Sequence, residues 1–155
     1  MSKSLKRVTE TLARAGLAST PVEMPGETRT AQQAADAAGC ALDQIVKSIL
    51  FQGEKGGLFL FLTAGGNQVD PERASAHAGE TLSRAEINTV RAVTGFAIGG
   101  VAPIGHLSPS PTWIDPKLLT FERVWAAAGT PRHIFPIAPH DLARLAAATV
   151  ADFTV

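Results

Sequence analysis

The chain contains 155 residues, of which 45% are hydrophobic, and this composition is typical of one domain with its own apolar core, here residues 1–155. The 14 Lys and Arg residues balance 14 Asp and Glu residues. The protein therefore lacks the basic field that holds a long nucleic-acid backbone, and a nucleic-acid partner would have to be bound locally. One cysteine, Cys40, excludes a disulfide within the chain.

The sequence also argues against a membrane or a metal. Residues 1–7 lack the apolar run of a signal peptide, and no segment approaches the ~20 apolar residues of a membrane span. The histidines and Cys40 have no metal-ligand spacing. We therefore expect a cytoplasmic protein without a membrane partner, a metal or an organic cofactor.

The first half of the chain predicts two helices and a hairpin. Apolar residues recur at helical spacing ahead of Gly16, and Thr30 with Gln33 forms a capping-box pattern. We expect, in order, a helix over residues 5–15, a short strand over 21–24, a helix over 31–38, and a β-hairpin with strands at 45–52 and 58–63.

The second half predicts a mixture of helices and strands. Ser83 and Glu86 form a second capping-box pattern, and several prolines make residues 103–116 irregular. We expect helices at 71–78 and from 87, an extended piece near Trp113, strands at 119–125 and 133–137, a helix from Pro139 and a last strand at 150–155. This order has no steady βαβ rhythm, which predicts a mixed α/β fold whose largely antiparallel sheet is surrounded by helices.

The most unusual segment is residues 94–105, which contains four glycines and Pro103 but no charge. Gly99 and Gly100 allow a ligand to approach the main chain and can direct successive N–H groups toward one point. Such donors stabilise an anion or the oxyanion of an attacked ester. The same spacing is also typical of a tight loop between strands.

A lysine interrupts an apolar row in the first strand of the hairpin. Strand alternation places Ile45, Lys47, Ile49 and Phe51 on one face. A buried ammonium needs water, a partner or a ligand. A lysine that reaches solvent along its aliphatic stem explains the pattern equally well.

These features together resemble the YbaK/EbsC family, which includes a domain associated with prolyl-tRNA synthetases. The resemblance covers nearly the whole chain and rests on Lys47 with its strand, on residues 30–35, and on residues 99–103, which match the family's Gly-x-x-x-Pro motif. It implies the family's fold and its activity, the hydrolysis of amino acids wrongly attached to tRNA, in several members tRNA for proline. The implied partners are the acceptor end of an aminoacyl-tRNA and prolyl-tRNA synthetase.

The resemblance also makes Lys47 the family's functional lysine. An aminoacyl-tRNA ester is already activated, so positioned water, or a substrate hydroxyl or thiol, can cleave it without a protein nucleophile. We expect the amides of Gly100 and Val101 to receive the developing oxyanion. We expect Lys47 to hold the terminal adenosine or a nearby phosphate.

A synthetase cannot fully reject amino acids smaller than or similar to its own, because one methylene is worth only ~1–3 kcal/mol of discrimination. A second, smaller pocket would supply the missing selectivity. The residues expected to bind the substrate are Ser48, Phe51, Thr94, Gly95, Gly99, Ala102, Pro103, Gly105 and His133. Candidate walls are Phe51, Phe96, Ile98 and Val101, for which core packing is an equal explanation. Candidate tRNA contacts by charge are Arg7, Arg14, Lys47, Arg132 and Arg144. The amino acid removed stays open among alanine, cysteine, serine, threonine and small non-protein analogues.

Two other functions fit the same residues. One is a non-catalytic module that binds an aminoacyl or nucleotide end and delivers it to a synthetase, and the other is a small-molecule ester hydrolase. The chain has no Gly-x-Ser-x-Gly elbow and no Walker phosphate loop, which argues against a serine hydrolase or an NTPase. The sequence favours a free-standing deacylase of misacylated tRNA, with tRNA-Pro as the expected substrate.

Overall fold

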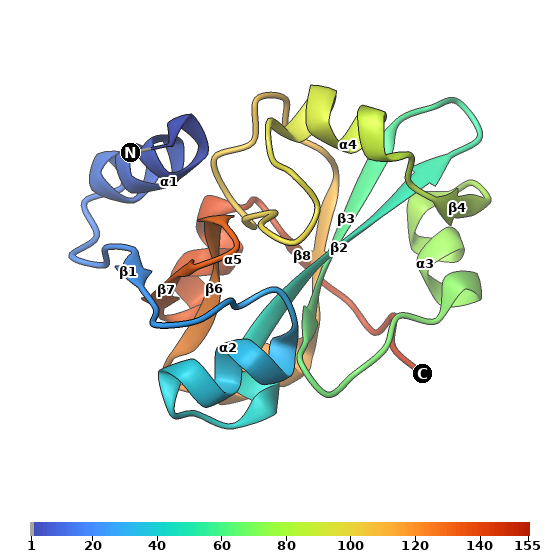
Figure 1. The fold of residues 1–155 in the computed structure, drawn as a ribbon. Helices are drawn as coiled ribbons and strands as arrows, with labels where there is room; N and C mark the ends of the chain where they lie inside the picture. The colour runs from blue at the N-terminus through green and yellow to red at the C-terminus, as the bar shows by residue number, and fades with distance from the viewer. Residues whose placement is uncertain (1) are drawn as a thin grey trace.

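A computed structural model describes residues 2–155 (Figure 1). The α-helices are α1 (Lys3–Arg14), α2 (Ala31–Ala38), α3 (Pro71–Ala78), α4 (Ile87–Thr94) and α5 (Pro139–Leu145), and the 3-10 helices are η1 (Leu42–Gln44) and η2 (Pro116–Thr120). The strands are β1 (Val22–Glu23), β2 (Ile45–Gly53), β3 (Leu58–Ala64), β4 (Leu82–Arg84), β5 (Thr112–Ile114), β6 (Val124–Thr130), β7 (His133–Ile137) and β8 (Thr149–Val150).

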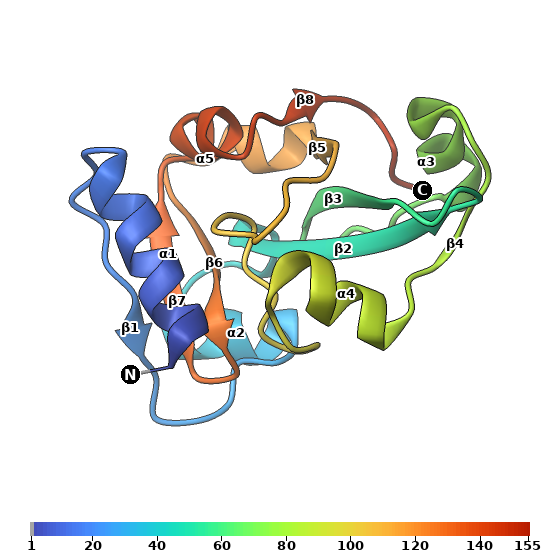
Figure 2. The same cartoon turned by 90° about the horizontal axis from the view of Figure 1, so that it is seen from above.

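The strands form one mixed sheet in the order β1-β7-β6-β2-β3-β5-β8, with β4 paired separately to β2. Antiparallel pairs join β2 to β3 and β4, and β7 to β1 and β6. Parallel pairs join β2 to β6, β3 to β5, and β5 to β8. Helices lie on both sides of the central β2–β3 pair, with α5 opposite α4 (Figure 2). The predicted mixed α/β fold is confirmed.

Two different strands share one edge of β2. Strand β3 pairs with the other edge along the length of the hairpin. On the shared edge, β6 pairs only with Ile45 and Val46, and β4 pairs only with residues 51–53. Residues 47–50 therefore lie in a gap between β6 and β4, and this gap positions the site described below.

Local signals explain the ends of the first helices. In α2, the Gln33 N–H donates to the Thr30 hydroxyl at 3.1 Å and the Thr30 N–H donates to the Gln33 side chain at 3.2 Å, which is the predicted capping box. Gly39 ends this helix with a φ of 67°. Ser2 caps α1, in which Val8 and Leu12 are fully buried in the main core.

Three predictions about the later elements are wrong. Ser83 does not cap α4, because it lies in β4 and its hydroxyl donates to the Gln52 carbonyl at 3.3 Å. The strand predicted at 119–125 is replaced by the end of η2 and by β6, which begins only at Val124. The last strand covers Thr149–Val150 rather than 150–155, and beyond it Thr154 forms an isolated bridge with Val69.

Candidate active site

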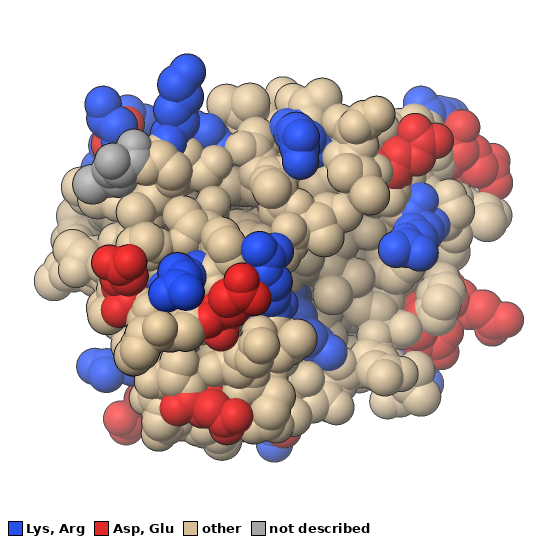
Figure 3. All heavy atoms as spheres, in the orientation of Figure 1, with Lys and Arg blue, Asp and Glu red and all other residues tan. Residues whose placement is uncertain are grey.

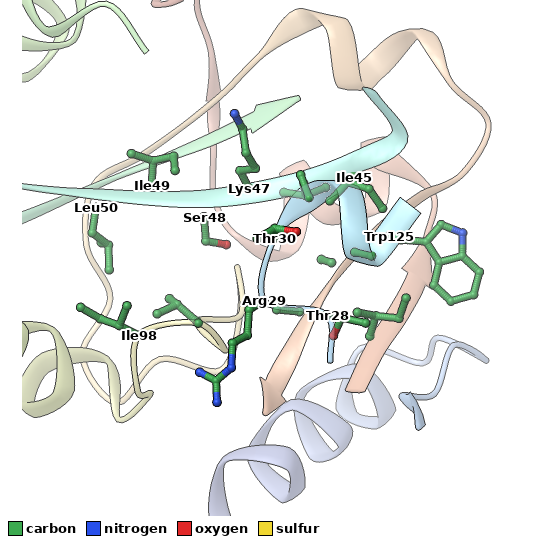
Figure 4. Close-up of a pocket in the computed structure, with 18 of the residues that line it drawn as sticks. Thr28, Arg29, Thr30, Ile45, Lys47, Ser48, Ile49, Leu50, Ile98 and Trp125 are labelled. Atoms are coloured by element: carbon green, nitrogen blue, oxygen red, sulfur yellow. The ribbon is translucent and has the colours of Figure 1, made fainter. Parts of the chain in front are cut away.

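A cavity of about 410 Å³ lies along the gap in the edge of β2 (Figure 4). Its lining comes from residues 28–31 and Ala34, from residues 45–50 of β2, from Arg84, Ala85 and Val90, from Ile98, Gly99 and Val101, and from residues 125–127 and Ile134. Most of these side chains are apolar, with a few hydroxyl and cationic groups among them. A pocket of this size and lining suits a small ligand that carries some polar atoms.

The side chains of β2 alternate across the strand as the sequence predicts. Lys47 and Ile49 extend from one face, whereas Ser48 and Leu50 extend from the other, toward Ile98 (Figure 4). The Ser48 Oγ is buried and has no hydrogen-bond partner within residues 2–155. An unpaired buried hydroxyl costs free energy, so the cavity contains a polar group that is not satisfied by the fold itself.

Lys47 belongs to the cavity lining, but its ammonium lies across the strand from Ser48 and Ile98 (Figure 4). Its Nζ donates to the Asn67 carbonyl at 2.5 Å. Burial lowers the pKa of Lys47, and the negative charges of Asp115 and Asp43 oppose this shift. The ammonium is therefore partly desolvated and held by a main-chain carbonyl rather than by a carboxylate.

The glycine-rich loop contributes Gly99 and Val101 to the cavity. Gly99 has a φ of 94°, which favours glycine, and a Cβ on it would lie 2.9 Å from the Arg29 Nη1. The Gly100 N–H donates to the Ala97 carbonyl at 3.1 Å, so this amide is already used inside the loop. Within residues 2–155, the Val101 N–H has no acceptor. The amides of Ile98 and Gly99, which also line the cavity, likewise have no acceptor in this part of the chain, so the loop offers several main-chain donors beside the cavity.

Gly100 has a second structural reason to be glycine. It is buried, and a Cβ on it would lie 3.1 Å from main-chain atoms of Thr130 and 3.2 Å from Gly129. These contacts are with backbone, which yields less easily than a flexible side chain. The loop is thus packed closely on the turn that joins β6 to β7.

The other predicted binding residues lie outside the cavity lining. Phe51 packs edge-on against Phe61 in a second apolar cluster, with ring centroids 5.8 Å apart. Thr94 is fully buried, and its hydroxyl donates to the Val90 carbonyl at 2.7 Å. The His133 Nδ1 bonds to the Thr130 hydroxyl at 2.6 Å.

The remaining members of this group support the loop. Gly95 ends α4 with a φ of 79°, and Ala102 and Pro103 are buried. The Gly105 carbonyl accepts a hydrogen bond from the Arg7 Nε at 3.0 Å. These residues hold the ends of the loop, while Gly99 and Val101 reach the cavity.

The segment before α2 forms a wall that was not predicted as part of the site. The Thr28 N–H donates to the Pro131 carbonyl at 2.7 Å, which fixes this segment to the β6–β7 turn. Arg29 pairs with Glu27 at 3.2 Å and lies beside the glycine-rich loop. The capping box marked this segment in the sequence as a helix start, but nothing local showed that it faces β2.

The cationic residues predicted from charge alone are mostly held elsewhere. Arg7 donates to the Gly105 and Thr94 carbonyls and lies 4.8 Å from the centre of the Phe96 ring. Ion pairs or a main-chain contact also hold Arg14, Arg132 and Arg144. The arginines that line the cavity are instead Arg29 and Arg84. Figure 3 shows basic side chains spaced around a hollow near the middle of the drawn face, with acidic ones between them.

Residues 2–155 lack the features of a metal centre and of a membrane-spanning helix. Residues 2–155 contain no group of three or more His, Cys, Asp or Glu side chains that could hold a metal ion. None of the helices in this part of the chain has the length and apolar character needed to cross a bilayer.

The fold is that of an editing domain. Residues 25–145 match the family model described as the aminoacyl-tRNA editing domain, and the chain belongs to this family. The whole chain superposes with a TM-score of 0.92 on the crystal structure of a candidate trans-editing enzyme for prolyl tRNA synthetase. The two sequences are 46% identical, and the match covers 99% of that protein. The chain also superposes on the crystal structure of the hypothetical protein APE2540 with a TM-score of 0.88. The two sequences are 26% identical, and the match covers 96% of this chain and 99% of APE2540.

Three further proteins are similar to the chain in sequence. The uncharacterized protein YwhH of Bacillus subtilis (strain 168) is 30% identical over 120 residues, which are 77% of this chain and 76% of YwhH. The candidate Cys-tRNA(Pro)/Cys-tRNA(Cys) deacylase EbsC of Enterococcus faecalis (strain ATCC 700802 / V583) is 23% identical over 81% of this chain and 77% of EbsC. A proline–tRNA ligase of Kosmotoga olearia is 36% identical over 85 residues, 54% of this chain but 14% of the ligase.

Proposed function

We propose that this protein hydrolyses the ester bond of a tRNA that carries a wrong, small amino acid, with tRNA-Pro as the substrate. In this proposal residues 1–155 act as one editing domain in the cytoplasm, separate from the synthetase. The observation that carries the proposal is the cavity lined jointly by the incomplete edge of β2 and by Ile98, Gly99 and Val101 of the glycine-rich loop. The names of the relatives support the link to prolyl-tRNA.

The chemistry requires no protein nucleophile. A water oxygen bonds to the ester carbonyl carbon, and the carbonyl oxygen becomes an oxyanion that the Val101 N–H stabilises. The bond from that carbon to the ribose oxygen then breaks. The proton lost by the water passes to the ribose oxygen, which yields a free amino acid and a tRNA with an intact 3′ end. One such donor contributes ~10²–10³ in rate.

Lys47 is proposed to hold the terminal adenosine or a nearby phosphate. In the present conformation its Nζ donates to the Asn67 carbonyl, so this role requires the side chain to exchange that carbonyl for the ligand. A phosphate oxygen, which is charged, would offer a partly desolvated ammonium a stronger acceptor than a neutral carbonyl does. Gly100 contributes by keeping the loop close to the β6–β7 turn.

The cavity also supports selection by size. A synthetase cannot fully reject amino acids smaller than or similar to its own, because a methylene is worth only ~1–3 kcal/mol. A second cavity with apolar walls from Ala34, Leu50 and Ile98 admits a small side chain after the first selection has failed. The protein would then remove what the synthetase accepts by error.

The direct test is a panel of tRNA-Pro samples, each carrying a different labelled amino acid, incubated with the purified protein. We expect rapid release of the label from one or a few small amino acids and no release from prolyl-tRNA. Retention of every label together with measurable binding would replace this proposal with that of a non-catalytic binding module. Retention of every label without binding would also refute it.

A further inference from the structure

Along β2, the main-chain N–H and C=O groups of successive residues point alternately to the two edges of the strand. The Gly53 N–H donates to the Gly57 carbonyl at 2.9 Å across the hairpin, so Gly53 faces β3. In an antiparallel pair, residues that exchange hydrogen bonds alternate with residues that face away. The N–H and C=O groups of Lys47, Ile49 and Phe51 therefore also point toward β3. Those of Ser48 point toward the opposite edge of β2.

That opposite edge has no strand beside Ser48. The ladder to β6 ends at Val46, and the ladder to β4 begins at Phe51. The cavity occupies the space between these two ladders. The N–H and C=O of Ser48 consequently face the cavity, where its hydroxyl also lacks a partner within residues 2–155. Main-chain N–H and C=O groups in folded proteins are nearly always paired with the chain, with water or with a ligand, and a bound ligand is one way to satisfy those of Ser48.

We propose that the Ser48 main chain is the subsite for the aminoacyl group, which binds as one residue of a missing strand. An aminoacyl ester contains the same N–Cα–C=O unit as a residue of a strand. Its α-ammonium donates to the Ser48 carbonyl, and its ester carbonyl accepts from the Ser48 N–H. A carbonyl oxygen has two lone pairs, so it can also accept from Val101. This inference rests on the proposed deacylase function.

The dimensions of the gap exclude a long peptide strand but leave room for an aminoacyl group. Four residues of β2, 47–50, separate the two ladders, and at ~3.3 Å per residue this is a length of roughly 13 Å. A longer strand would meet β6 at one end and β4 at the other. The gap therefore limits a bound strand to about four residues, and a single N–Cα–C=O unit is enough to exchange both hydrogen bonds with Ser48.

The ligand side of the subsite is tested with three esters of the same tRNA, namely alanyl, lactyl and propionyl. Lactate replaces the α-ammonium by a hydroxyl, and propionate removes it. Each enzymatic kcat/KM is divided by the spontaneous hydrolysis rate of the same ester, because the ammonium itself activates the ester. We expect the corrected value to fall at least about tenfold from alanyl to propionyl, with lactyl between them, since a hydrogen bond from a charged group is lost.

The protein side is tested by replacing one amide with an ester. An ester between Ser48 and Ile49 weakens the Ser48 carbonyl as an acceptor and also removes the Ile49 N–H that faces β3. The control is an ester between Leu60 and Phe61, because Phe61 is the register partner of Ile49. We expect the first change to slow alanyl-tRNA hydrolysis several-fold more than propionyl-tRNA hydrolysis. The control is expected to affect both substrates by the same factor.

The outcomes separate this inference from the function on which it rests. If the protein releases no amino acid from any tRNA in the panel, the deacylase proposal fails. If alanyl and propionyl esters are accelerated equally, the deacylase remains but the Ser48 subsite is overturned. The substrate series gives this answer even if neither ester-containing protein folds.

Discussion

Replacing Gly99 by alanine separates the fold of the glycine-rich loop from its chemistry. Gly99 has a φ of 94°, and an alanine at a left-handed position is strained by ~1–2 kcal/mol. For a chain of this length each kcal/mol lowers the Tm by roughly 2–4 °C, so we expect a decrease of about 2–8 °C. The new Cβ would lie 2.9 Å from the Arg29 Nη1, the end of a flexible side chain that can move aside.

The matched control is Gly79→Ala. Gly79 has a φ of 77° at the end of α3, and no atom lies within 4 Å of the position of its Cβ. The two variants therefore carry similar backbone strain, but only Gly99 lies in the cavity. We expect similar Tm values for both, measured by thermal unfolding.

Deacylation rates then decide whether the loop acts on the substrate. Loss of an oxyanion donor costs ~10²–10³ in rate, and we expect the backbone strain in Gly99→Ala to shift the Val101 N–H rather than to remove it. We expect kcat to fall at least about tenfold in Gly99→Ala and to stay near the wild-type value in Gly79→Ala. If both variants lose the same stability and both keep the wild-type rate, the loop amides do not contribute to hydrolysis.

Three further changes test other parts of the structure. Lys47→Met should lower kcat/KM for aminoacyl-tRNA at least about tenfold if the ammonium binds substrate; an unchanged kcat/KM with a lower Tm would leave Lys47 only its bond to Asn67. Asp115→Asn should lower the free energy of unfolding in urea by about 2–3 kcal/mol, because this carboxylate is 3% exposed and accepts three N–H donors; a smaller effect would mean that the neutral amide can replace it. Burial lowers the pKa of His106 in the folded protein below its usual 6.5. As the pH falls below 6.5, the unfolded state therefore binds a proton at His106 before the folded state does, and the free energy of unfolding decreases until the pH reaches the folded pKa. The Tm of wild type should therefore fall more than that of His106→Gln between pH 7.5 and 5.5, and equal decreases would contradict this.

Sequence signals predicted the elements whose causes are local. The capping box of α2 involves only Thr30 and Gln33, and the structure contains both of its hydrogen bonds. The same pattern failed at Ser83, because pairing with β2 competes with it. There the Glu86 N–H donates to the side chain of Gln52 at 3.1 Å. A partner 34 residues away in the sequence thus replaces the local cap.

The candidate site shows the same limit. Strand alternation correctly placed Lys47 and Ile49 on one face of β2 (Figure 4). The cavity, however, lies along the edge of β2, and its position depends on where β4 and β6 begin and end. These strands are distant in the sequence, and the start of β6 was itself predicted wrongly. The walls that they contribute were therefore not predictable from the pattern around Lys47.

The incomplete edge of β2 is itself an argument about function. A strand that continued from β6 to β4 would satisfy every main-chain group on that edge, and folding alone would favour such continuity because unpaired buried amides cost free energy. Here the two ladders stop at Val46 and start again at Phe51, and a cavity lies between them. The stability given up at Ser48 is available to a ligand that supplies the missing hydrogen bonds. Catalytic and binding groups are expected where a fold leaves such bonds unmade, and Val101 of the glycine-rich loop lines this same cavity.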